Sequence, residues 1–108
     1  MNLQLKKKRC VVTGASQGLG RSIATILASE ECELVLVARR KKPLQDTAKL
    51  IAKKYKTKVF ILSLDVTSKN ADTKIKNFAL SKLGSIDILI NSAGGSRPTT
   101  WDAPESFW

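Results

Sequence analysis

The sequence predicts an α/β fold in which helices cover both faces of a parallel β-sheet. Four short apolar segments alternate along the chain with three amphipathic segments, and successive apolar segments are separated by a dozen or more residues. Connections of that length join parallel strands through right-handed helical crossovers. A glycine-containing turn also follows the first apolar segment. Together these observations predict a doubly wound sheet of four strands in the order 3-2-1-4.

The expected strands are nearly continuous apolar runs, which is typical of parallel strands buried on both faces. They span Arg9–Thr13, Glu33–Ala38, Val59–Leu64 and Ile86–Ile90. The fourth strand would form an edge of the sheet, although its sequence lacks the lysine or proline that commonly protects an exposed edge. We therefore expect the natural folding unit to continue beyond these four strands.

Three helices are expected between the strands. They span Gly20–Ser29, Lys42–Lys54 and a segment from a cap at Ser68 to about Leu83. The first helix places Ile23, Ile26 and Leu27 on one side, which predicts that this side is buried. Pro43 suits the first turn of the second helix, and Gly84 suits the C-terminal end of the third.

Basic residues dominate the charge of the 108-residue chain, which is formally +10. They fall into separate groups, which are Lys6–Arg9, Arg39–Lys42 and the lysines between residues 49 and 58. Lys49, Lys53 and Lys56 have helical spacing opposite apolar positions, which is typical of a solvated helix face. Because no aromatic residues are interleaved with them for base stacking, we do not expect a nucleic-acid partner. A basic nucleic-acid-binding module stays open as an alternative.

The cysteine and histidine content bears on the compartment and on metal binding. The chain has two cysteines, Cys10 and Cys32, and no histidine. Without a Cys-x-x-Cys pair, we expect reduced thiols in a cytoplasmic protein and no metal site. No apolar run approaches the roughly 18–20 residues of a membrane span, and the first nine residues do not resemble a secretory signal. We therefore expect no membrane partner.

The stretch from Val11 to Gly20 predicts a buried strand, a glycine turn and the first turn of a helix. Such a junction binds anions, because unpaired backbone N–H groups and the positive end of the helix dipole point at one spot. Gly14 allows the tight turn, Gly18 lets a diphosphate approach the backbone, and Gly20 lets the helix pack closely on the strand. We therefore expect a dinucleotide to bind here.

Three motifs in order strengthen this expectation. The pattern Thr-Gly-x-x-x-Gly-x-Gly begins at Thr13, Asp65-Val66 follows the third strand, and Asn91-Ser-Ala-Gly94 follows the fourth. Their order and spacing resemble the short-chain dehydrogenase/reductase family over about residues 8–108. The resemblance implies a Rossmann-type fold, here as an incomplete three-layer αβα sandwich, and an NAD(P)-dependent oxidoreductase.

The resemblance also implies which residues hold the cofactor. The glycine turn would bind the pyrophosphate, and Asp65 and Val66 would bind the adenine. Asn91 would anchor the fourth strand, with Ala93 and Gly94 against the nicotinamide-side ribose. The expected cofactor-binding residues are Gly14, Ser16, Gln17, Gly18, Leu19, Gly20, Arg39, Asp65, Val66, Asn91, Ala93 and Gly94. Two alternatives stay open: Asp65 as an ordinary turn residue, and Asn91 as a strand-end cap without ligand contact.

Arg39 favours NADP(H) over NAD(H) as the cofactor. It closes the second strand, about 20 residues after the glycines, at the position that meets the adenosine ribose. A carboxylate there would bind the 2′-hydroxyl and repel a 2′-phosphate, whereas a guanidinium can bind the phosphate through two hydrogen bonds. Ser16 lies near enough to assist, and Arg40–Lys42 are interpreted as surface charge.

Two positions depart from the family pattern. Glu31 follows the first helix where members usually have glycine, so we expect a positive φ and strain on the order of 1 kcal/mol. Ser92 replaces the commoner second asparagine of the third motif, which we take as a mild change.

The family's catalytic residues are a serine and a downstream Tyr-x-x-x-Lys, whose tyrosine acts as general acid/base. Tyr55 is the one tyrosine here, with Val59 four residues later, and a helix start at Asp102 has only about one turn of chain after it. We therefore expect residues 1–108 to be the N-terminal part of a single NAD(P)-binding domain, inactive alone. The complete enzyme would act on a small carbonyl or alcohol and form a homo-oligomer. The alternative is a short product that binds nucleotide without turnover.

Overall fold

The computed structural model describes residues 7–92, and all seven predicted elements lie in that range. The strands are β1 (Arg9–Thr13), β2 (Glu33–Ala38), β3 (Val59–Ser63) and β4 (Ile88–Asn91), and the helices are α1 (Gly18–Ser29), α2 (Lys41–Tyr55) and α3 (Ala71–Leu83). The strands form one parallel sheet in the order β3-β2-β1-β4. The predicted fold class and strand order are confirmed.

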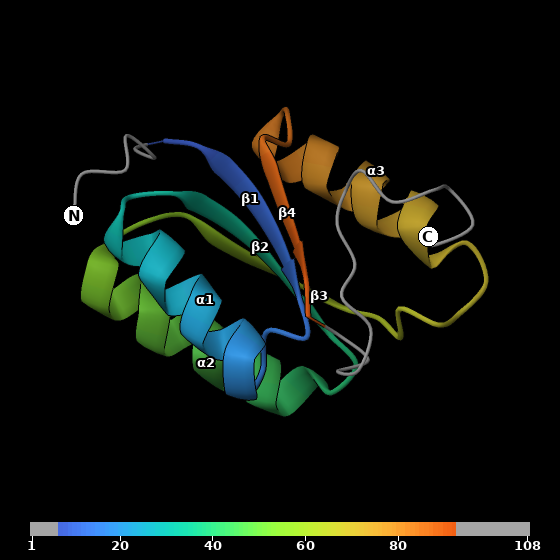
Figure 1. The fold of residues 1–108 in the computed structure, drawn as a ribbon, viewed down its shortest axis with the longest axis horizontal. Helices are drawn as coiled ribbons and strands as arrows, with labels where there is room; N and C mark the ends of the chain where they lie inside the picture. The colour runs from blue at the N-terminus through green and yellow to red at the C-terminus, as the bar shows by residue number, and fades with distance from the viewer. Residues whose placement is uncertain (1–6, 93–108) are drawn as a thin grey trace.

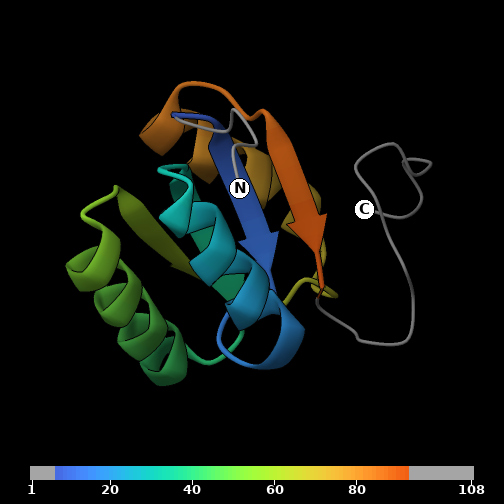
Figure 2. The ribbon, with the colours of Figure 1, turned by 60° about the vertical axis from the view of Figure 1, so that its left-hand side comes forward.

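The helices cover both faces of the sheet. α1 and α2 lie side by side on one face and α3 lies on the other (Figures 1 and 2). Leu34 and Leu36 of β2 belong to the core under α1 and α2, and Val35 and Val37 belong to the core that β2 forms with Ile75 of α3. Successive residues of β2 therefore pack on opposite faces, which explains its continuous apolar run.

Two local predictions about the helices are wrong. Ser68 does not cap α3, because its hydroxyl donates to the Asp65 carbonyl at 2.5 Å and α3 begins only after Asn70. Ile26 does not face the core, since 56% of it is exposed. α1 lies against the sheet with the small residues Ala24 and Ala28, and this rotation turns Ile26 outward. The other boundaries agree with the predicted ones or differ from them by one or two residues.

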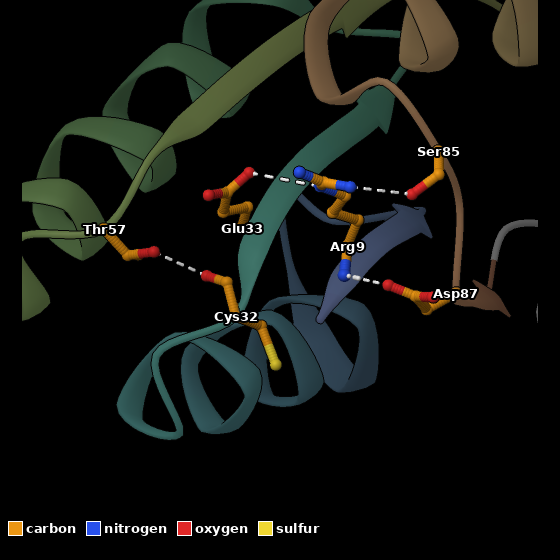
Figure 3. A network of polar contacts seen from close by, with 6 residues as sticks. All are labelled: Arg9, Cys32, Glu33, Thr57, Ser85 and Asp87. Atoms are coloured by element: carbon orange, nitrogen blue, oxygen red, sulfur yellow. Dashed lines mark hydrogen bonds and ion pairs between the residues drawn. The ribbon is translucent and has the colours of Figure 1, made fainter. Parts of the chain in front are cut away.

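A polar cluster joins β1 to its neighbours at the amino ends of the strands (Figure 3). The Arg9 backbone N–H donates to Asp87 Oδ2 at 2.8 Å, and the Asp87 N–H donates to the Arg9 carbonyl at 2.7 Å. The Arg9 guanidinium donates to Ser85 Oγ at 3.0 Å and lies 3.7 Å from the Glu33 carboxylate. These contacts fix the register of β4 against β1 at one end of the sheet.

The turn between α1 and β2 has the positive φ that the sequence predicts. Glu31 has a φ of +65° and its backbone N–H donates to the Ala28 carbonyl at 2.9 Å. The left-handed conformation is unfavourable for any residue with a Cβ, because that atom crowds the following carbonyl oxygen. The turn therefore reduces the stability of the fold at this position.

Replacing Glu31 by glycine is expected to raise the free energy of unfolding by about 0.5–1 kcal/mol, since the Cβ strain is relieved at some entropic cost. Glu31→Ala is the matched control, because it removes the same side chain and keeps the Cβ. Urea unfolding followed by circular dichroism measures both variants. Equal stability of the glycine and alanine variants would contradict strain at this turn.

Candidate functional site

A cavity of about 1090 Å³ opens at the carboxyl ends of the strands. It lies where β1 is flanked by β2 on one side and β4 on the other, so that the strand order reverses there. Doubly wound sheets bind ligands at such a switch point. The loops that follow all four strands contribute to the lining of the cavity.

Ten of the twelve predicted cofactor-binding residues line this one cavity. They are Gly14, Ser16, Gln17, Gly18, Leu19, Gly20, Arg39, Asp65, Val66 and Asn91. The remaining two, Ala93 and Gly94, lie outside the described residues, as does the predicted helix start at Asp102. Residues separated by up to 77 positions in sequence, from Gly14 to Asn91, therefore meet around one hollow.

The glycine turn leaves the amino end of α1 open to the cavity. Gly14 and Gly18 have φ values of +64° and +58°. Gln17 flanks the helix without a side-chain capping hydrogen bond, and the first turn of α1 holds no acidic residue. The first backbone N–H groups of the helix and the positive end of its dipole are thus available to an anion.

Gly20 is required by close packing. A Cβ built on it would lie 2.1 Å from the Gly14 carbonyl oxygen and 2.5 Å from Ser92 Oγ. The predicted close approach of the helix is therefore confirmed. Its nearest partners are the glycine turn itself and the residue after β4.

Side-chain hydroxyls join the carboxyl ends of β1 and β4. The Thr13 hydroxyl donates to Asn91 Oδ1 at 2.7 Å, and the Ser92 hydroxyl donates to the Thr13 carbonyl. Asn91 ends β4 opposite Thr13 and also lines the cavity, so it joins the two strands at the cavity wall. Ser92 lines the cavity as well, although we had interpreted it only as a mild departure from the family pattern. Its position in the third motif, directly after Asn91, could have indicated that it belongs to the site.

Arg39 and Arg40 lie exposed at the rim of the cavity, where β2 leads into α2. The Arg39 carbonyl accepts a hydrogen bond from Ser63 Oγ at 3.0 Å, which holds its backbone against the end of β3. The first turn of α2 contains no acidic residue. Two guanidinium charges and the positive end of a second helix dipole therefore adjoin the cavity. Arg40 is exposed, in keeping with its interpretation as surface charge, but it also lines the cavity.

Asp65 forms a turn and lines the cavity at the same time. Its Oδ1 accepts hydrogen bonds from the Thr67 hydroxyl at 2.6 Å and from the Thr67 backbone N–H at 2.9 Å. These bonds, led by the hydroxyl and supplemented by the charge of Arg39, lower the pKa of the Asp65 carboxyl below its usual value. The side chain is therefore anionic at neutral pH and held in one orientation.

Several other lining residues were not predicted. Ile23, Ala38, Pro43, Leu64, Thr67 and Ile90 complete the wall. Most of them are apolar and come from helix turns or strand ends. At such positions an apolar residue predicts a place in the core and does not indicate a ligand site. They supply the apolar surface against which a planar ring could lie.

The described part of the chain holds no group of three or more metal-ligating side chains and no helix long and apolar enough to cross a membrane. Cys10 and Cys32 form no disulfide and are both buried under α1, and burial raises the pKa of each thiol. Neither cysteine lines the cavity.

Known proteins of similar sequence and structure agree with this geometry. An uncharacterized oxidoreductase of Staphylococcus saprophyticus is 41% identical over 92 residues, which are 85% of this chain and 39% of the relative. L-sorbose reductase from Gluconobacter frateurii, solved with NADPH and L-sorbose, superposes with a TM-score of 0.84 and 33% identity over 100% of this chain and 41% of its own. A 7α-hydroxysteroid dehydrogenase complexed with NADH and 7-oxo glycochenodeoxycholic acid superposes with a TM-score of 0.81 and 32% sequence identity. The superposition covers 97% of this chain and 41% of the dehydrogenase.

The chain spans about 40% of the length of these relatives. The short chain dehydrogenase family itself matches residues 8–106, which include the glycine turn, the Asp65 turn and the end of β4. The chain therefore belongs to the short-chain dehydrogenase family of oxidoreductases, which bind a nicotinamide dinucleotide.

Proposed function

We propose that residues 1–108 form the N-terminal, cofactor-binding part of a cytoplasmic oxidoreductase domain and bind NADP(H) in preference to NAD(H). One arrangement supports this proposal: the uncapped amino end of α1 opens on the same cavity as the guanidinium groups of Arg39 and Arg40. The first element suits a diphosphate, and the second suits a further phosphate.

Different lining residues would bind different parts of the cofactor. The N–H groups from Gly18 to Gly20 would hold the diphosphate. Asp65 would accept a hydrogen bond from the adenine amino group through Oδ2, because Thr67 already occupies Oδ1. Asn91 would hold the end of β4 beside the nicotinamide half. Hydride transfer to a carbonyl or from an alcohol is the chemistry that the cofactor supplies when it is bound.

The preference for NADP(H) rests on charge at the adenosine end. Arg39 stands at the end of β2, its backbone fixed by Ser63, and Arg40 follows at the amino end of α2. A 2′-phosphate brings negative charge to this basic rim, where a guanidinium offers paired donors. The nearby carboxylate, Asp65, is already engaged in its own turn. Solved relatives bind either cofactor, so the argument depends on these residues.

The complete protein would contain further chain, since its relatives are more than twice as long. We propose that this further chain supplies the catalytic serine, tyrosine and lysine, the small-molecule substrate pocket and the surfaces of a homo-oligomer. Residues 1–108 would then bind cofactor without turnover.

Titration of the chain with NADPH and with NADH tests the proposal. We expect NADPH to bind at least tenfold more tightly, because charge-assisted hydrogen bonds to one phosphate contribute about 1.5–3 kcal/mol. Isothermal titration calorimetry at a stated salt concentration measures both dissociation constants. Equal affinities would overturn the preference, and no binding of either cofactor by the folded chain would overturn the function.

A further inference from the structure

The positive charge of the chain is concentrated on α2 and its flanks. Residues 39–58 hold nine basic side chains and one acidic side chain, Asp46, and thus eight of the ten net positive charges of the chain. All nine basic residues are exposed. Two of the three basic groups of the sequence therefore lie exposed on α2 and immediately beside its two ends.

Helix stability explains only part of this surface. The Lys42 ammonium lies 3.2 Å from the Asp46 carboxylate, which is the ion pair of α2 within residues 7–92. Lys49 and Lys53 are one turn apart with like charge, an arrangement that disfavours the helix. Leu44, Thr47 and Ile51 face the core on the opposite side. Lys53 and Lys54 lie in the last turn of α2, where the helix dipole favours positive charge. The dipole does not account for Lys49, which lies a full turn before that end.

Large apolar side chains are exposed on the same helix layer. Leu50 of α2 is 57% exposed, and Ile26 of the adjacent α1 is 56% exposed. Both helices lie on the same face of the sheet (Figure 2). The layer therefore combines cationic side chains with isolated apolar ones, a composition found in surfaces that rest on lipid headgroups.

We infer that the α2 surface, defined by Lys42, Lys49, Lys53 and Lys54 with Leu50, binds the surface of a bilayer that contains anionic lipid. Clusters of four to eight basic residues on a helix are attracted to such a surface, and the cytoplasmic leaflet is the anionic one. Leu50 would enter the headgroup region. This attraction does not require a helix that spans the membrane.

A nucleic acid fits these side chains less well. The basic residues from 41 to 58 are all lysines, which bind phosphate as point charges without the paired donors of arginine. No aromatic ring is interleaved among the exposed lysines of α2 for base stacking, since Tyr55 at its end is half-buried with Lys54 Nζ 5.3 Å from its ring centre. A phosphate backbone would also leave Leu50 in water.

Cosedimentation of the 108-residue chain with vesicles tests the inference without any cofactor, so its failure is distinct from a failure of NADP(H) binding. One set of vesicles is phosphatidylcholine alone, and the other contains about a third phosphatidylserine. We expect binding only to the anionic vesicles, weakening as salt rises. The variant Lys49→Gln/Lys53→Gln/Lys54→Gln should lose roughly 100-fold in partition coefficient, or about fivefold for each lysine.

The matched control is Lys69→Gln/Lys74→Gln/Lys76→Gln, which removes the same charge from exposed residues at α3 on the other face of the sheet. It should lose no more than a few fold. Circular dichroism checks that both variants are folded, and Leu50→Ser should weaken vesicle binding in a folded chain. Equal losses in the two lysine variants, equal binding to neutral vesicles, or tighter binding to duplex DNA or RNA at the same salt would overturn the inference.

Discussion

Replacing Gly20 by alanine is expected to destabilise the chain by about 3 kcal/mol and to abolish cofactor binding. The new Cβ would lie 2.1 Å from the Gly14 carbonyl oxygen, a backbone atom that cannot rotate away. Relief would require α1 to move off the turn, and its amino end would then no longer face the cavity. Urea unfolding measures the loss of stability, and titration with NADPH measures the loss of binding.

Gly18→Ala is the matched control for this change, since it adds the same methyl group two residues earlier in the same motif. A Cβ at Gly18 would meet no atom within 4 Å, but its φ of +58° is unfavourable for alanine. We therefore expect a loss of only about 1–2 kcal/mol. If the two variants were equally stable, close packing at Gly20 would not be the reason for its glycine.

Replacing Arg39 by aspartate is expected to weaken NADPH binding roughly 100-fold and to leave NADH binding equal or tighter. The change removes a phosphate ligand and places a carboxylate where it can accept a hydrogen bond from a free 2′-hydroxyl. Because the Arg39 side chain is exposed at the rim, the fold should be unaffected. Dissociation constants for both cofactors, measured at one salt concentration, give the ratio of NADPH affinity to NADH affinity.

Lys41→Asp controls for the general effect of charge. It reverses the same charge two residues away at the first position of α2 but does not line the cavity. A few-fold loss of NADPH affinity, reduced further by added salt, is expected from such a screened charge. An equal loss in the two variants would mean that the field of the basic segment, and not a contact at Arg39, favours the phosphate.

The fold could be predicted because β1 and β2 are apolar on both faces and the glycine turn marks one strand–helix junction without ambiguity. The order of the strands was predicted from the strand order typical of doubly wound dinucleotide-binding sheets. The spacing of apolar residues was less reliable for predicting which side chains are exposed. Ile26 shares a helical side with Leu27, yet the small residues of α1 lie closest to the sheet and leave Ile26 exposed. Spacing alone does not tell which side of a helix can approach closely.

The candidate site was predictable where backbone conformation demands a particular residue, as at Gly14 and Gly20. It was less predictable where a side chain acts through long-range contacts. Ser92 donates to the Thr13 carbonyl from 79 residues away, and no local pattern reveals that bond. Arg40 joins the cavity wall only because α2 begins at Lys41 and turns its amino end toward the cavity.

The contacts between Arg9 and Asp87 affect the opposite end of β4, where Asn91 lies beside the cavity. β4 is only four residues long, and a slip of one residue against β1 would exchange the side chains that pack under α1 and α2 with the side chain that packs under α3. Asn91 would then give up its place opposite Thr13 to a neighbour of different chemistry. Residues at the amino ends of the strands thus decide which amino acid lines the cavity at the carboxyl ends. Selection for cofactor binding should therefore also act on Arg9 and Asp87.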